Sequence, residues 1–336
     1  MILVAIFLIA LPYAGSADPP RLLRFEFEEP HMGTTWRIVM YASASDAASA
    51  ASRSAFARIA ELDTRLSDYN PTSELRTLEQ NATEQPLPVS ADLFRVLSAA
   101  QTLAAQTDGA FDVAVGTLTR LWRRARRLGE LPPQKEIDAA RAAAGHQHLE
   151  LDAAARTVKL SAGVQLDLGG IAKGYAADEA LRCLRAKGVT RAFVAGGGDI
   201  AIGDPPPGSP GWRVDASPGT VVLTHTGIST SGDTEQWLES GGVRYSHIID
   251  PRTGGAMSGR RLVTVIAPNA ITSDMLATAA SVLALPEALR LIEATPGTAA
   301  RIGTPEGGLE MRWLTSSRWP RGEGADQSVC GTVTCP

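Results

Sequence analysis

The order of its hydrophobic patterns limits what this chain can fold into. Helical and strand-like segments follow one another without the strand–helix–strand rhythm of a parallel sheet. Apolar residues at helical spacing predict helices at 45–62, from the cap Ser90 to about 105, at 134–144, at 172–187 and from near Thr272. Alternating apolar residues predict a hairpin over 149–160 and strands at 164–168, 192–194 and within 212–266. These patterns predict an α+β fold.

Composition excludes several classes of protein. Hydrophobic residues make up 44% of the 336 positions and charged residues 20%, which is typical of a globular chain rather than a disordered one. The 32 basic and 36 acidic side chains give a net charge of -4, so no basic field exists to bind nucleic acid. The long apolar run, residues 2–12, is too short to cross a bilayer.

The two ends of the sequence carry separate signals. Residues 1–17 combine that apolar run with small residues ending at Ala17, which predicts a signal peptide and an exported, periplasmic protein. A basic start is missing, and a buried first strand is the alternative. Residues 18–315 would form one domain and 316–336 a polar, loosely held tail. Cys330 and Cys335 could pair in an oxidising compartment, whereas Cys183 is expected in a helix as a small core residue. No cysteine follows the apolar run to accept a lipid.

A helix start near Thr272 brings oxygen ligands together. Thr272 or Ser273 could cap this helix, and Asp274 and Thr278 would then lie on one face, four residues apart. A carboxylate and a hydroxyl joined by backbone carbonyls form an all-oxygen set, which suits Mg²⁺. Ordinary capping also explains an aspartate in a first turn, and spacing alone favours that simpler interpretation.

Two glycine-rich turns could approach a ligand. Residues 166–174 (LDLGGIAKG) run from an expected strand into a helix, where free N–H groups and Lys173 could bind a phosphate. The spacing is neither a Walker A loop nor G-x-G-x-x-G. Residues 196–199 (GGGD) form the second turn. Each turn alone is more often structural, but together with the oxygen set they favour a phosphorylated ligand.

Two further segments carry candidate site residues. Phe111 and Asp112 follow a helix stop at 108–109; they could line a ligand slot, or form an Asx turn with the ring in the core. His247 lies between an apolar strand and a charged turn, so it could act as a base, although a lone strand histidine is usually structural.

Taken together, these segments resemble the FAD:protein FMN transferase (ApbE) family. The eight segments occur in order over about residues 25–312: 32–36 (MGTTW), 62–74 (LDTRLSDYNPTSE), 109–112 (GAFD), 166–176 (LDLGGIAKGYA), 195–199 (AGGGD), 230–233 (TSGD), 247–254 (HIIDPRTG) and 273–278 (SDMLAT). The resemblance implies mixed helices and largely antiparallel sheets in a T-fold-like architecture. Thr117 stands where the family commonly has proline, and Met275 and Leu276 replace smaller residues, but no implied ligand is lost.

The resemblance also implies an activity. Family members split FAD, release AMP and join FMN to a Ser or Thr hydroxyl of a partner flavoprotein, which can be membrane-associated. It implies that FAD contacts Met32, Tyr69, Ala110, Phe111, Asp112, Asp167, Lys173 and Ile249. It implies that Mg²⁺ is held by the Gly170 carbonyl, Asp274 and Thr278, with the Ala277 carbonyl close by. Asp274 is thus a catalytic as well as a metal-binding candidate.

His247 is assigned as the base that deprotonates the acceptor hydroxyl, a hypothesis that rests on its position. Two other functions remain open. Water in place of the acceptor would make the protein a Mg²⁺-dependent FAD pyrophosphatase giving FMN and AMP. An exported accessory protein that binds FAD without chemistry is the other alternative.

Overall fold

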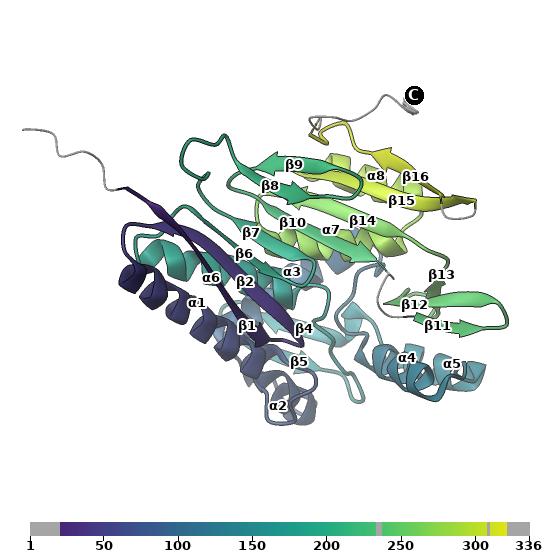
Figure 1. Cartoon of the computed structure of the whole chain (residues 1–336). Coiled ribbons are helices and arrows are strands. Elements are labelled where there is room, and N and C mark those ends of the chain that lie inside the picture. The colour runs from purple at the N-terminus through teal and green to yellow at the C-terminus, as the bar shows by residue number, and fades with distance from the viewer. Residues whose placement is uncertain (1–20, 233–236, 308–309, 321–336) are drawn as a thin grey trace, which may run out of the picture.

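The computed structural model describes residues 21–232, 237–307 and 310–320. Its largest element is an eight-stranded sheet in which each pair of neighbours is antiparallel (Figure 1). In spatial order the strands are β1 (Leu23–His31), β2 (Thr34–Ala42), β6 (Ala192–Gly196), β7 (Asp199–Ile202), β10 (Gly227–Gly232), β14 (Leu262–Ala267), β15 (Ala299–Gly307) and β16 (Glu310–Thr315). The expected α+β fold with largely antiparallel sheets is confirmed.

Helices cover one face of this sheet and a hairpin covers the other (Figure 1). The helical layer contains α1 (Ser45–Leu66), α3 (Ala91–Gln106), α6 (Ala172–Ala186), α7 (Ala270–Val282) and α8 (Leu285–Ala294). Alternation along β2 divides its side chains, so that Ile38 joins the helical core and Val39 joins the core beneath the hairpin. That hairpin is formed by β8 (Trp212–Asp215) and β9 (Thr220–Leu223).

A smaller lobe lies beside the main sheet (Figure 1). It consists of α4 (Gly116–Leu128), α5 (Gln134–Ala142) and the sheet of β11 (Trp237–Ser240), β12 (Val243–Ile249) and β13 (Ala256–Ser258). Leu118, Trp122 and Ile137 from the helices pack with Leu238 and Ile249 from the strands. The Trp122 Nε1–H donates to the Gly254 carbonyl oxygen at 2.9 Å, which ties α4 to the turn after β12.

The remaining elements lie beneath the helical layer. They are α2 (Glu74–Asn81), β3 (Leu87–Pro88), the short 3₁₀ helix His146–His148, β4 (Leu149–Asp152) and β5 (Thr157–Leu160). The hairpin expected over 149–160 is confirmed by the antiparallel pairing of β4 with β5. Ser90 caps α3 as expected, since its hydroxyl accepts the Leu93 N–H at 3.2 Å.

The strand expected at 164–168 is wrong. This segment is irregular because its backbone N–H groups form hydrogen bonds with residues that do not belong to a neighbouring strand. The Asp167 N–H donates to the Val113 carbonyl at 2.8 Å, and the Leu166 N–H donates to the Glu79 carboxylate at 2.6 Å. The segment therefore lies against the turn before α4, a contact that apolar alternation cannot reveal.

The expected cap of α7 is also wrong. The helix begins at Ala270, and Asn269 caps it by accepting the Thr272 N–H at 3.0 Å. Asp178 of α6 accepts the N–H groups of Ala270 and Ile271, each at 2.9 Å. Asp274 and Thr278 nevertheless keep their four-residue spacing inside the helix, so the site prediction does not depend on the cap.

The first residues of the predicted tail pack on the folded protein. Ser316 and Trp319 are buried, and the Arg318 guanidinium donates to the carbonyls of Ile292 and Thr298. The folded unit therefore continues past residue 315. Residues 1–17, with the predicted signal peptide, and residues 321–336, with Cys330 and Cys335, lie outside the described residues. Within the described ranges, no helix is both long and apolar enough to cross a membrane.

Candidate active site

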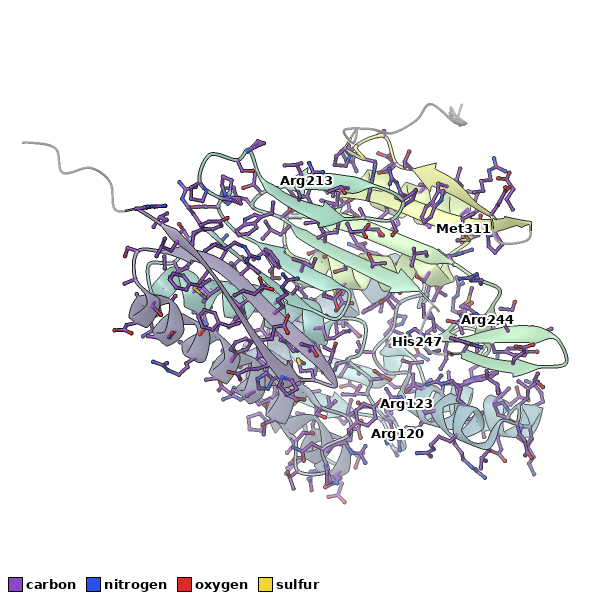
Figure 2. The ribbon with its side chains drawn as sticks, viewed as in Figure 1. Arg120, Arg123, Arg213, Arg244, His247 and Met311 are labelled. Carbon is purple, nitrogen blue, oxygen red and sulfur yellow. The ribbon has the colours of Figure 1, made fainter. Side chains whose placement is uncertain are left out.

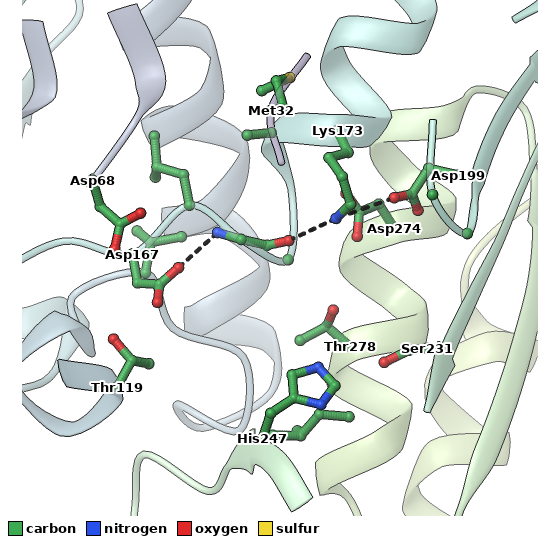
Figure 3. Close-up of a pocket in the computed structure, with 18 of the residues that line it drawn as sticks. Met32, Asp68, Thr119, Asp167, Lys173, Asp199, Ser231, His247, Asp274 and Thr278 are labelled. Atoms are coloured by element: carbon green, nitrogen blue, oxygen red, sulfur yellow. Dashed lines mark hydrogen bonds and ion pairs between the residues drawn. The ribbon is translucent and has the colours of Figure 1, made fainter. Parts of the chain in front are cut away.

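A cleft of about 1240 Å³ lies where the helical layer meets the small lobe (Figure 3). All thirteen site residues expected from the sequence line it, with Lys173, His247, Asp274 and Thr278 labelled among its walls in Figure 3. The walls come from the β1–β2 turn, the end of α1, the segment 110–126, the segment 167–173, the β6–β7 turn, β10, β12 and α7.

Close contact between α6 and α7 forms the back of the cleft. Gly174 permits this contact, because a Cβ there would lie 2.3 Å from the Ala270 carbonyl oxygen and 2.8 Å from the Asp274 Cβ. The Gly174 N–H donates to Asp274 Oδ2 at 3.0 Å. The Asp274 carboxylate is thereby fixed in a buried position, 5% exposed, at the end of the cleft nearest Lys173.

Gly170 and Thr278 face each other beside this carboxylate. A Cβ on Gly170 would lie 2.8 Å from Thr278 Oγ1, so only glycine leaves space between them. The Ala277 carbonyl accepts the Ser281 hydroxyl at 2.8 Å. The cleft therefore brings the Asp274 carboxylate and the Thr278 hydroxyl together with Gly170 and Ala277, whose carbonyls are the backbone members of the oxygen-only ligand set expected from the sequence.

Lys173 is the cation nearest to this set. Its Nζ lies 3.3 Å from Asp199 Oδ2 and donates to the Gly169 carbonyl at 3.2 Å. The Asp199 carboxylate holds the pKa of Lys173 above its usual value, so the ammonium stays charged. Burial, reinforced by Asp199, raises the pKa of Asp274, which is the behaviour of a carboxylate that needs a further cation to stay ionised in a buried site.

A second charged cluster lies across the cleft, on the side of α4. Arg123 pairs with Asp68, and its Nη2 lies 2.8 Å from Asp167 Oδ2. Its guanidinium carbon is 4.6 Å from the centre of the exposed Tyr69 ring, in cation–π contact. Asp167 also accepts the Gly169 N–H at 2.8 Å, so it connects this cluster to the glycine-rich turn within residues 166–174.

Asp112 forms the Asx turn that was one of its two interpretations. Its Oδ1 accepts the Ala114 N–H at 2.8 Å and its Oδ2 accepts the His146 N–H at 2.5 Å. Ala110 and Phe111 are buried in the main core, and all three residues also line the cleft. Burial raises the pKa of Asp112. The Asx turn and the core position of Phe111 are therefore confirmed, and contact of this turn with a ligand stays a prediction.

Met32, Ile249 and His247 complete the expected set. Met32 lies in the turn between β1 and β2 with φ +50, and its N–H donates to Asp63 Oδ2 at 2.8 Å. Ile249 is buried at the end of β12. His247, on the same strand, points into the cleft toward Thr278 and Ser231 (Figure 3), while Figure 2 places it above Arg123 at the junction with the small lobe.

Sequence reasoning missed Arg123, Arg126, Asp68 and Asp199 as residues lining the cleft. The helix α4 was not predicted, so its two arginines had no assigned position. A signal was available: Leu118, Trp122 and Ala125 recur at helical spacing and pack in the small lobe, which leaves Arg123 and Arg126 for other faces. The Asp199 partnership depends on a hairpin that brings it back toward α6, which no local pattern reveals.

Comparison with known proteins identifies the family to which this chain is similar. The sequence model of the ApbE family matches residues 32–302. The FAD:protein FMN transferase of Escherichia coli K12 is 30% identical over 334 residues, covering 93% of this chain and 95% of that protein. Its counterpart in Vibrio cholerae O1 is 33% identical over 279 residues, covering 79% and 83%.

Solved structures of ApbE proteins also resemble this chain in fold. The ApbE protein of Thermotoga maritima has a TM-score of 0.79 and 29% identity, covering 88% of this chain and 97% of that one. The apo form of the flavinyl transferase ApbE of Pseudomonas stutzeri has a TM-score of 0.78 and 31% identity, covering 88% and 95%. With its family pattern, its fold and nearly the full length of its relatives matched, this chain belongs to the ApbE family.

Proposed function

We infer that this protein is an FAD:protein FMN transferase, which cleaves FAD, releases AMP and attaches FMN to a Ser or Thr hydroxyl of a partner flavoprotein. The names of the full-length relatives support this activity. The observation that carries it is the meeting of Asp274, Thr278 and Gly170 in one cleft with Lys173 and His247. A phosphoryl transfer needs such groups to neutralise oxygen charge and to remove a proton from the attacking hydroxyl.

The residues present fit a Mg²⁺ ion. Among the described residues, no group of three or more His, Cys, Asp or Glu side chains is placed to hold a metal. The proposed set instead combines the Asp274 carboxylate, the Thr278 hydroxyl and the carbonyls of Gly170 and Ala277, and oxygen ligands of this kind suit Mg²⁺. When bound, the ion would supply charge neutralisation at the phosphate oxygens of FAD.

The side chains of the chain itself perform the other roles. Lys173, kept charged by Asp199, attracts the diphosphate and stabilises the charge that develops on it. His247 accepts the proton of the acceptor hydroxyl as its oxygen forms the bond to the FMN phosphorus. The bond between that phosphorus and the AMP oxygen breaks, and AMP leaves with the electron pair. The buried slot beside Phe111 and Ile249 accommodates the flavin ring.

AMP release from FAD tests this function. The purified chain is incubated with FAD and Mg²⁺, with and without an acceptor domain, beside Asp274→Ala and His247→Ala. We expect AMP together with covalent flavin on the acceptor, and we expect Asp274→Ala to lose both products. His247→Ala should bind FAD normally and transfer slowly, and a full transfer rate in this variant would eliminate His247 as the base.

The same assay separates the two alternative functions. AMP accompanied only by free FMN, whether or not acceptor is present, would identify an FAD pyrophosphatase. Tight binding of FAD without AMP under either condition would leave a flavin carrier. Either result would overturn the transferase assignment.

A further inference from the structure

Helix α4 places a cationic side chain in the cleft that the mechanism above does not use. Thr119, Arg123 and Arg126 all line the cleft, and their spacing of four and three residues puts them on one face over two turns. The neighbouring face of the helix packs Leu118 and Trp122 into the small lobe. Gly116 fixes the helix start, because a Cβ there would lie 2.6 Å from the backbone carbon of Gln165.

The other two cations of the cleft are already paired with carboxylates. Arg123 pairs with Asp68 and Asp167, and Lys173 pairs with Asp199. Within the described ranges, Arg126 has no carboxylate within ion-pair distance and no hydrogen-bond partner. It is only partly exposed, and burial together with the neighbouring Arg123 lowers its pKa. Its charge is therefore held in the cleft wall at an electrostatic cost that, within the described residues, only the Tyr69 side chain opposes.

The composition of the cleft shows what this guanidinium would attract. Aspartates outnumber cations among the lining residues: Asp63, Asp68, Asp112, Asp167, Asp199 and Asp274 against Arg123, Arg126 and Lys173. An anionic ligand that enters such a cleft is repelled by most of its walls. A guanidinium with a free fork of N–H donors binds phosphate oxygens in two parallel hydrogen bonds.

We propose that Arg126 binds a phosphate group of FAD and makes the cleft select phosphorylated flavin or adenosine ligands over uncharged ones. This inference rests on the proposed function, which supplies FAD as the ligand. Arg126 lies three residues beyond Arg123 along α4, which is about 4.5 Å along the helix axis. It therefore binds from the α4 wall of the cleft, while Lys173 binds from the α6 wall.

The test compares binding by Arg126→Gln with binding by the wild-type protein, in EDTA so that only protein cations contribute. The probes are FAD, FMN, AMP, inorganic pyrophosphate and riboflavin, measured by flavin fluorescence or calorimetry. Loss of a charge-assisted hydrogen-bond pair should weaken FAD binding about 10- to 100-fold. Pyrophosphate binding should weaken in the same direction, and riboflavin binding should not change. Weaker AMP binding would place the contact on the adenosine phosphate, and weaker FMN binding on the flavin phosphate.

Two further variants control for folding and for general charge. Arg127→Gln removes an exposed arginine from the same helix and should bind every probe as the wild type does. Arg126→Lys keeps the positive charge but lacks the paired N–H donors of the guanidinium, so it should lose less FAD affinity than Arg126→Gln. The melting temperature of Arg126→Gln should not fall, because a partly buried cation beside Arg123 is removed.

Three results of the binding test would overturn the proposal. They are unchanged FAD and pyrophosphate binding in both Arg126 variants, an equal loss of riboflavin binding, and an equal loss in Arg127→Gln. A change confined to the KM for the acceptor would also overturn it, because the arginine would then contact the partner. Failure of the wild type to bind FAD while pyrophosphate binding still depends on Arg126 would refute the proposed function and retain the phosphate contact.

Discussion

The contact between α6 and α7 at Gly174 can be tested by adding one methyl group. In Gly174→Ala the new Cβ would lie 2.3 Å from the Ala270 carbonyl oxygen, and ordinary contact begins at 3.4 Å. The obstacle is backbone, which cannot rotate away, so the two helices must separate by about 1 Å. The separation also pulls Asp274 away from the Gly174 N–H that fixes it at 3.0 Å.

The two expected effects have different sizes. Overpacking costs about 1–3 kcal/mol, and the better helix propensity of alanine returns about 1 kcal/mol. The net loss in unfolding free energy is therefore about 0–2 kcal/mol, measurable by urea denaturation. A displacement of about 1 Å at reacting groups lowers rates on the order of 100-fold. AMP release from FAD at saturating Mg²⁺ should fall by that factor although the protein remains folded.

Gly188→Ala provides the matched control. Gly188 follows α6 with φ +79, and a Cβ added there would have nothing within 4 Å, so alanine costs about 1–2 kcal/mol in left-handed strain alone. The variant should lose a similar amount of stability and leave AMP release unchanged. A wild-type rate in Gly174→Ala, or an equal loss of rate in Gly188→Ala, would refute the argument that α6–α7 contact positions Asp274.

Three other perturbations address the elements that hold the site. Asn269→Ala removes the α7 cap and should cost about 1 kcal/mol in urea denaturation; no loss would show that Asp178 alone caps the helix. Burial raises the pKa of Asp178 to about 6, so the folded protein binds that proton more tightly than the unfolded chain. Asp178 should therefore contribute a fall in unfolding free energy as pH rises from about 4 to about 6, and the slope should be smaller in Asp178→Asn than in the wild type. Trp122→Phe leaves the Gly254 carbonyl without its donor and should cost about 1–3 kcal/mol; an unchanged unfolding midpoint would contradict this role.

Local patterns predicted the elements whose ends carry their own signals. Ser90 marks the start of α3, and the glycines at 109 and 188 mark the ends of two helices with φ of +73 and +79. The strand prediction at 164–168 was wrong because an alternation of apolar residues does not show which groups the backbone N–H groups bond to. Here the partners are a carbonyl at Val113 and a carboxylate at Glu79, both distant in sequence.

Some features of the site could likewise be predicted from local sequence patterns, and others could not. Asp274 and Thr278 lie four residues apart on one helix, so their shared face follows from helix geometry. The placement of Gly170 against Thr278 and of Lys173 against Asp199 depends on tertiary packing, and only the family resemblance indicated the first of these. Arg123 and Arg126 were missed because their helix was missed, although its apolar face was present in the sequence.

The stoichiometry of transfer tests the central claim most directly. An acceptor domain that the Escherichia coli relative flavinylates is incubated with this protein, FAD and Mg²⁺, and the acceptor mass and the AMP released are measured together. The account predicts that each acceptor gains one FMN by a bond to a Ser or Thr oxygen, with one AMP released per FMN attached. AMP formed in excess over attached flavin, or an acceptor whose mass stays unchanged while FAD is consumed, would contradict it.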